Sequence, residues 1–192
     1  MDIILIKFLR IFTFYLVCFL VFLGMAGCQD KVAPPSAGPK HGEFVSLTIT
    51  GYNYTNRYIN EFYVDGNGGH NIFVSSPTSG GGGSVCCVKY IIGATLWKPE
   101  IRWQVGGCTY NSRKDKYGES FFDIHHFYKQ VEAPLDVKIP NDPKYLEVHF
   151  YPDGHVETAM TEQPSPPRLA LSADREEKSP YKVCPDDKKP AT

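Results

Sequence analysis

Alternation of apolar and polar side chains is the feature that most constrains what this chain can fold into. Val45, Leu47 and Ile49 are separated by hydroxyl-bearing residues, which is the two-residue period of a strand with one buried face. The same period recurs over residues 101–105 and 146–151. Beyond the apolar N-terminus, residues 114–121 are the one weak candidate for a helix. The sequence therefore predicts a mainly β protein.

Clusters of Gly, Pro and Asn divide the middle of the chain into a series of short strands. Pro152-Asp153-Gly154 predicts a tight turn between the last two strands. Short strands at this spacing favour an antiparallel β-sandwich or a small barrel-like domain. The predicted strands comprise residues 45–50, 58–64, 71–75, 85–92, 101–105, 121–131, 146–151 and 155–159.

The N-terminus predicts export. A basic start precedes an almost wholly apolar run over residues 11–23, as in a secretory signal peptide. Ala26-Gly27 directly before Cys28 resembles a bacterial lipobox, in which the cysteine is acylated and becomes the first mature residue. The alternative is a membrane-spanning helix, but residues 11–27 only reach the lower limit of about 17 residues for spanning.

We therefore expect residues 1–27 to be a lipoprotein signal peptide and Cys28 to carry the lipid that anchors the protein in a membrane. Met25 departs from the pattern, since such boxes usually carry Leu there. Gln29, rather than Asp, after the acylated cysteine favours the outer membrane, with the protein on its periplasmic face.

Composition divides the exported chain into three parts. Residues 28–42, rich in Pro and Gly, are expected to be a flexible tether. Residues 43–160 are expected to form the β-domain, which is of single-domain size. Residues 161–192 are rich in Pro and charge, so this tail would be disordered unless Cys184 ties it back. The net charge of −1 argues against a nucleic-acid partner.

Four cysteines remain outside the leader and the lipidation site: Cys86, Cys87, Cys108 and Cys184. In an oxidising compartment an even number predicts two disulfides. A bridge between Cys86 and Cys87 is the least favoured pairing, because adjacent cysteines close only a strained eight-membered ring. We expect one of the two to pair with Cys108 and the other with Cys184, and the sequence leaves both combinations open.

The run of glycines before these cysteines does not resemble a phosphate-binding loop. Ser84 and Val85 follow it instead of Lys and Ser/Thr, and a strand rather than a helix comes next. We expect a flexible loop, in which Gly81 and Gly82 are a candidate contact for a partner. Adjacent cysteines on a strand face opposite sides, which disfavours a shared metal ion.

Catalytic patterns are weak throughout the chain. A Gly-x-Ser-x-Gly elbow and a paired-carboxylate constellation are both absent from the sequence. His149 and His155, with Glu147 and Glu157, are expected to form the solvated polar face of a hairpin. We therefore expect a binding protein, not an enzyme, without a cofactor or a small-molecule substrate.

The segment Tyr52-Asn53-Tyr54-Thr55-Asn56-Arg57-Tyr58 concentrates the residue types found at binding hot spots. We expect Tyr52, Tyr54, Arg57 and Tyr58 to contact a partner. The alternative is a turn whose tyrosines pack at the edge of a sheet.

Several long motifs together resemble one family, the bacterial lipoproteins carrying domain of unknown function 3304. The resemblance covers about residues 43–190 and rests on GYNYTNRYINEFYVDGNGG (51–69), VSSPTSGGGGSVCCVKY (74–90), IRWQVGGC (101–108), KYLEVHFYPDGHVE (144–157) and PSPPRL (164–169). It implies a small periplasm-facing lipoprotein, of a kind often encoded beside type VI secretion genes and phospholipase effectors. By this resemblance the chain is an immunity protein that binds and blocks a phospholipase effector. The alternative is an envelope lipoprotein with a structural or assembly role and no toxin partner.

Overall fold

The computed structural model describes residues 38–94, 97–135, 138–178 and 181–191. The predicted signal peptide, Cys28 and most of the predicted tether lie outside these residues. Within the described part of the chain, no helix has the length and apolar character needed to cross a membrane.

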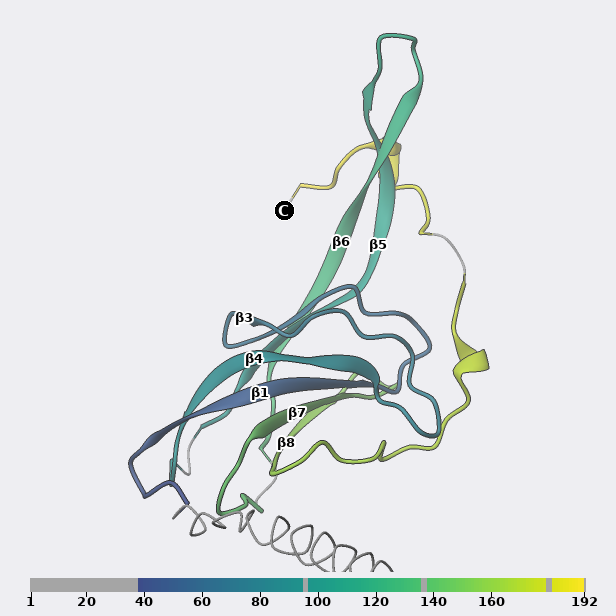
Figure 1. The fold of residues 1–192 in the computed structure, drawn as a ribbon. Coiled ribbons are helices and arrows are strands. Elements are labelled where there is room, and N and C mark those ends of the chain that lie inside the picture. The colour runs from purple at the N-terminus through teal and green to yellow at the C-terminus, as the bar shows by residue number, and fades with distance from the viewer. Residues whose placement is uncertain (1–37, 95–96, 136–137, 179–180, 192) are drawn as a thin grey trace, which may run out of the picture. The chain divides into compact units, whose positions relative to one another are not determined.

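The described residues fold into two four-stranded sheets, which do not close into a barrel (Figure 1). This confirms the prediction of a mainly β fold. The first sheet has the order β4-β1-β7-β8 and consists of β1 (Phe44–Asn53), β4 (Gly81–Ile91), β7 (Tyr145–Phe150) and β8 (Val156–Thr161). The second sheet has the order β3-β2-β5-β6 and consists of β2 (Phe62–Val64), β3 (Asn67–Gly68), β5 (Glu100–Lys114) and β6 (Ser120–Glu132).

One strand pair departs from the antiparallel prediction. β1 and β7 run parallel, whereas the other pairs within the two sheets run antiparallel. Parallel neighbours need a long crossover connection, and here that crossover includes the whole second sheet. Alternation within a strand says nothing about the direction of its neighbour, so the sequence did not reveal this pair.

The hydrophobic core lies between the two sheets. Phe150 of β7 packs against Phe62 of β2 and Trp103 of β5, with ring centroids 5.4 and 5.6 Å apart. Burying each such side chain contributes about 1.5–3 kcal/mol. Leu47, Ile49, Ile101, Leu146 and Val148 are also fully buried in this core.

Strands β5 and β6 continue far beyond the core as a two-stranded arm (Figure 1). The prediction had β5 end at Val105 and allowed a helix over residues 114–121, and both expectations were wrong. β5 runs to Lys114, and the next residues form the turn of the hairpin. The Asp115 carboxylate closes this turn by accepting hydrogen bonds from the backbone N–H groups of Tyr117 and Glu119, each at 2.8 Å.

The glycine run belongs to a strand and is not the flexible loop that was expected. Gly81 and Gly82 begin β4, where Gly81 pairs with Tyr52 of β1. Gly81 has a φ of +91°, and a Cβ there would lie 1.9 Å from the carbonyl oxygen of Phe73. Glycine is therefore required at Gly81 by both the backbone conformation and the close approach of a neighbouring chain segment.

The disulfides correct the predicted pairing. Cys86 bonds to Cys87, across a cis peptide, and Cys108 bonds to Cys184. The reason is the arrangement of the strands: Cys86 and Cys87 lie on β4 of the first sheet, whereas Cys108 lies on β5 of the second. Cys184 reaches β5 and not β4, so Cys86 and Cys87 have only each other as bonding partners.

The tail after β8 is a strap along the domain. It passes beneath the first sheet and then runs up beside the β5–β6 hairpin (Figure 1), with two short 3₁₀ turns at Ala173–Arg175 and Pro185–Asp187. Beside β5, the backbone N–H of Thr109 donates to Lys182 and the N–H of Cys184 donates to Thr109. The bond between Cys184 and Cys108 holds this part of the tail against β5.

Candidate protein-binding surface

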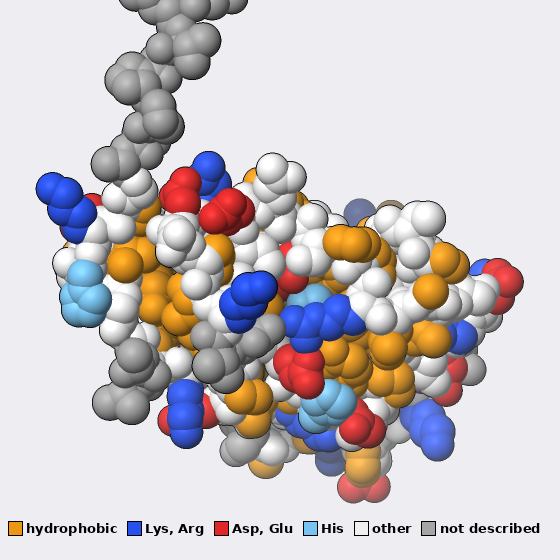
Figure 2. Space-filling model, turned by 90° about the horizontal axis from the view of Figure 1, so that it is seen from below, with side chains coloured by type: hydrophobic (Ala, Val, Ile, Leu, Met, Phe, Trp, Pro, Cys, Tyr) orange, Lys and Arg blue, Asp and Glu red, His pale blue; other side chains and the backbone are white. Residues whose placement is uncertain are grey.

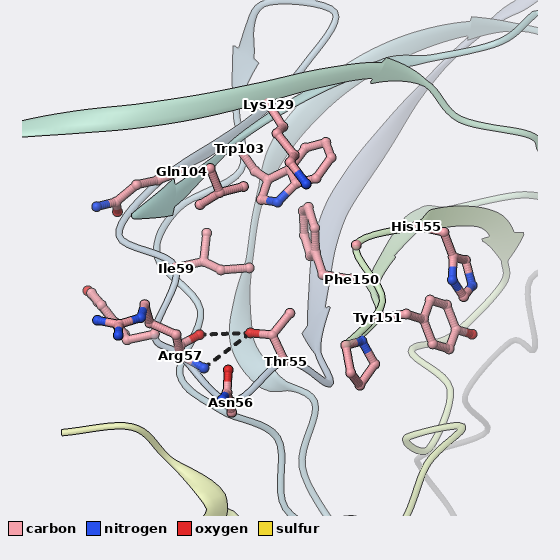
Figure 3. A pocket seen from close by; sticks show the side chains of 14 residues that line it. Thr55, Asn56, Arg57, Ile59, Trp103, Gln104, Lys129, Phe150, Tyr151 and His155 are labelled. Atoms are coloured by element: carbon pink, nitrogen blue, oxygen red, sulfur yellow. Dashed lines mark hydrogen bonds between the residues drawn. The ribbon is translucent and has the colours of Figure 1, made fainter. Parts of the chain in front are cut away.

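A hollow of about 140 Å³ opens between the ends of the two sheets (Figure 3). Ile59, Trp103 and Phe150 supply apolar surface to it, and loops of the two sheets supply much of the rim. Arg57 stands on one side and Tyr151 and His155, from the turn between β7 and β8, on the other. The hollow has the size of a single side chain and combines an apolar floor with a polar rim.

A buried asparagine fixes the loop that carries one wall of this hollow. Asn53 is 0% exposed, and its carboxamide oxygen accepts from the backbone N–H and the hydroxyl of Thr55 at 3.0 and 2.6 Å. Its amide group donates to the carbonyl of Arg57 at 2.8 Å. These local bonds set the path of residues 55–58, so Arg57 and Tyr58 are presented from a rigid turn.

Gln104 secures the continuation of this loop and its contact with the second sheet. Its carboxamide oxygen accepts from the backbone N–H of Asn60 at 2.9 Å, and its amide group lies 2.8 Å from the hydroxyl of Tyr181 in the tail. The same amide group lies 2.5 Å from Nδ1 of His126 on β6. Loop, arm and tail are therefore connected through one side chain that is 3% exposed.

The rim is basic. Arg57 forms an ion pair with Glu177 of the tail, and the exposed Lys129 of β6 points down over the floor (Figure 3). The chemistry of the hollow suits an acidic or aromatic side chain from a partner protein, because the cations lie at the rim and the floor is aromatic.

The arm next to the hollow exposes apolar residues on both of its faces. Phe122 is 63% exposed and Tyr117, at the turn, is 78% exposed. Soluble proteins rarely leave such a group of apolar side chains uncovered unless it contacts something. The other large apolar residues exposed on the arm are Val105, Phe121, Ile124, Phe127 and Val131.

A second polar group lies buried on the outer face of the first sheet. Glu147 and His149 are 1% and 0% exposed, and their nearest side-chain atoms, Oε2 and Nε2, are 3.3 Å apart. Tyr52, opposite His149 in the sheet register, stacks on the imidazole at 4.5 Å between ring centroids. The tail covers the group: the backbone N–H of Ser165 donates to Glu147 at 2.6 Å.

Protonation of this group follows from its hydrogen bonds. Burial lowers the pKa of His149, against the opposing effect of its hydrogen bond with Glu147. Burial alone would raise the pKa of Glu147, but the hydrogen bonds from His149 and Ser165 outweigh it and hold this pKa below its usual value. A neutral His149 with its proton on Nε2 donates to Glu147 and accepts at Nδ1 from the hydroxyl of Tyr54. That hydroxyl accepts in turn from the backbone N–H of Arg168, at 2.8 Å.

The surface around this buried group carries a row of charged and hydrogen-bonding side chains. The Arg168 guanidinium lies 2.6 Å from Glu157, and His155 lies 2.5 Å from Asp153. Figure 2 views this side of the molecule and shows charged side chains of both signs adjoining one another. The prediction of a solvated His and Glu face is therefore correct only in part. The tail removes Glu147 and His149 from water but leaves His155 exposed.

The structure separates the predicted contact residues into two groups. Tyr52 and Tyr54 are 3% and 0% exposed, so their prediction as surface contacts was wrong, and the cause is the tail that lies over them. Arg57 and Tyr58 are partly exposed and line the hollow. Sequence reasoning missed Gln104, Lys129 and Tyr151, which no local pattern connects.

Gly81 and Gly82, the other predicted contacts, are partly exposed but lie within β4. A Cβ at Gly82 would lie 2.8 Å from the carbonyl oxygen of Gly51, so close approach of the backbones accounts for this glycine. Within the described residues, no group of three or more His, Cys, Asp or Glu side chains is placed to hold a metal ion.

These features define a disulfide-stapled protein of two sheets, with a candidate site in the hollow at the ends of the sheets. A family model for a protein of unknown function (DUF3304) matches residues 52–158, and the chain belongs to this family. Neither a search of curated proteins nor a search of solved structures finds a match to this chain.

Proposed function

We propose that the chain is a lipid-anchored, periplasm-facing immunity protein that binds and neutralises a phospholipase effector of type VI secretion. The observation that carries the proposal is the hollow rimmed by Arg57, Tyr58 and Lys129, which lies beside the exposed apolar side chains of the β5–β6 arm. The lipobox-like end of the leader at Cys28 supports the location. The resemblance to lipoproteins encoded near such effectors supports the class of partner.

Physical properties of the surface suit an inhibitor. A hollow that receives one side chain is the usual setting of a hot spot, because the inserted residue loses contact with water completely. The walls are fixed by Asn53 and Gln104 before a partner arrives. Pre-organised walls reduce the entropy lost on binding, so more of the contact energy becomes affinity.

The direct test starts from the gene next to the one for this chain, which the proposal expects to encode a phospholipase, and measures protection of cells from that enzyme. The phospholipase is directed to the periplasm of a host with or without the full chain, and growth and copurification are measured. We expect growth to be restored and the two proteins to copurify. Failure to form a complex at micromolar concentration, together with unrelieved toxicity, would remove the proposal in favour of a structural envelope role.

Two matched variants test the surface. Val105 lines the hollow and Ile91 lies on β4, and they are 40% and 41% exposed. Val105→Glu places a charge at the hollow and is expected to weaken the complex about tenfold or more, because a change at a hot spot costs about 2 kcal/mol or more and about 1.4 kcal/mol is tenfold in affinity. Ile91→Glu adds the same charge elsewhere and is expected to bind as wild type. Equal binding by both variants would place the interface away from the hollow.

The anchor is tested separately. Cys28→Ser is expected to release the protein from membranes while leaving its affinity for the phospholipase in solution unchanged. A Cys28→Ser protein that stays in the membrane fraction contradicts the lipoprotein assignment without affecting the binding claim.

A further inference from the structure

Strand β6 has an open edge. It is the last strand of the second sheet, and within the described chain β5 is the only strand hydrogen-bonded to it. Its 13 residues present a row of backbone N–H and C=O groups without strand partners on the outer side. None of its residues is buried. An edge of this length readily accepts another strand.

Two of the usual protections of an edge strand, proline and a β-bulge, are missing from β6. Its sequence, SFFDIHHFYKQVE, has neither Pro nor Gly. The two irregularities of the hairpin put the extra residue on β5, at Val105 and Ser112, so β6 itself is regular. The other edge of β5, in contrast, is covered by the tail, which hydrogen-bonds to both the N–H and the C=O of Thr109. The fold covers one edge of the arm and leaves the other open.

The sequence of β6 is complementary to itself. Asp123 and Lys129 each lie three residues from His126, on opposite sides of it. Ile124 and Tyr128 each lie two residues from it. In an antiparallel pair, residues at mirror positions stand opposite each other on the same face.

We propose that β6 pairs antiparallel with β6 of a second copy of this chain, with His126 opposite its counterpart. In this register Asp123 faces Lys129 twice, once on each side of the two-fold axis. Ile124 faces Tyr128, and Phe121 faces Val131, which are the aromatic and β-branched pairs that stabilise sheets. No like charges stand opposite each other, because Glu132 faces Ser120.

The mirrored charges are what favour a second copy over another partner. Charges on an edge strand commonly prevent pairing, and like charges at mirror positions would do so here. Opposite charges at equal distances from His126 instead attract a second copy in one register. An interface of two identical strands is isologous and closes after two copies, so the pairing gives a dimer and not a fibre.

The register is tested by disulfide trapping of the full chain in cells. His126→Cys is expected to give a covalent dimer on non-reducing gels, because the residue faces itself. Ile124→Cys and Tyr128→Cys alone are expected to give little dimer, whereas the two together in one chain are expected to give it efficiently. Trapping at Ile124→Cys alone, or none with the double variant, would overturn the register.

A charge exchange tests the same pairing without added cysteines. In sedimentation velocity of the detergent-purified chain, Asp123→Lys or Lys129→Asp should each weaken the dimer about tenfold or more, because two attractive pairs become repulsive. The double exchange should restore it. A monomeric wild-type chain, single variants that leave the dimer unchanged, or a double exchange that fails to restore it would overturn the proposal.

Both measurements are made without a phospholipase. A dimer found in a chain that gives no protection would leave this inference standing and remove the proposed function. Protection by a strictly monomeric chain would do the reverse.

Discussion

The tail covers the outer face of the first sheet but leaves most of the arm of the second sheet exposed. On the first sheet, the tail lies over Tyr52, Glu147 and His149 and leaves each of them at most 3% exposed. On the arm, the tail touches one edge of β5 near Thr109, while Phe122 on the neighbouring strand stays 63% exposed. Polar side chains are thus buried and apolar ones exposed, the reverse of the usual distribution.

The difference teaches that polarity alone did not decide which surface the tail covers. Glu147 and His149 tolerate burial because the backbone of the tail and the tyrosines satisfy their hydrogen bonds. Phe122 and its neighbours have no such cover, although burying them would be favourable. An apolar surface left open beside available chain is best explained by contact with another molecule.

The largest effect on stability is expected from removing the disulfide that holds the tail against β5. Cys108 and Cys184 are 76 residues apart in sequence, and for a loop of this length the chain-entropy model gives about 4–5 kcal/mol. Replacing both by Ser should lower the free energy of unfolding by that amount in urea titrations. The matched control replaces Cys86 and Cys87 by Ser, since their separation of one residue closes no long loop. Equal losses for the two pairs would show that the tail is held by other contacts.

A smaller effect is expected from acid, and it reports on the covered face alone. Burial lowers the pKa of His149 in the folded protein, so the unfolded chain binds a proton first as the pH falls. Stability is therefore fully present above the ordinary histidine pKa of about 6.5 and decreases as the pH falls below it. The pKa of Glu147 is also held low, and its contribution is lost in the same direction, but only at more acidic pH.

Urea midpoints at pH 7.5 and pH 5.5 measure this dependence. We expect a lower midpoint at pH 5.5 for the wild-type chain and for His155→Gln, which alters an exposed histidine. His149→Gln should flatten the dependence between these two pH values. A wild-type midpoint that rises on acidification would mean that His149 is charged in the folded protein and would contradict the neutral assignment.

Local patterns predicted the strands well because alternation reports directly on a half-buried strand. The period over Val45, Leu47 and Ile49 gave the position of β1, and the period over residues 146–151 gave β7. The same patterns correctly put Glu147 and His149 on the face opposite the core. They could not show that the tail covers this face, because that contact joins residues such as Glu147 and Ser165 through a chain segment without a pattern.

Long-range pairing was the part that the sequence could not supply. Whether Cys86 bonds to Cys87 or to Cys108 depends on which sheet each strand joins. The hollow likewise collects Arg57, Gln104 and Tyr151 from three separate segments. Arg57 and Tyr58 could be grouped from the sequence because the turn that presents both of them is local and is held by Asn53.

The smallest effect is expected at the tip of the arm, where a large residue is predicted to contribute almost nothing to folding. Tyr117 is 78% exposed, and the turn is held through its backbone N–H by Asp115. Tyr117→Ser should therefore change the free energy of unfolding by less than about 0.5 kcal/mol. The same replacement at Tyr54, which is 0% exposed beneath the tail, should cost about 3–5 kcal/mol. Comparable losses at the two tyrosines, measured by urea unfolding, would show that the arm is packed in solution and that the contrast between the two regions does not hold.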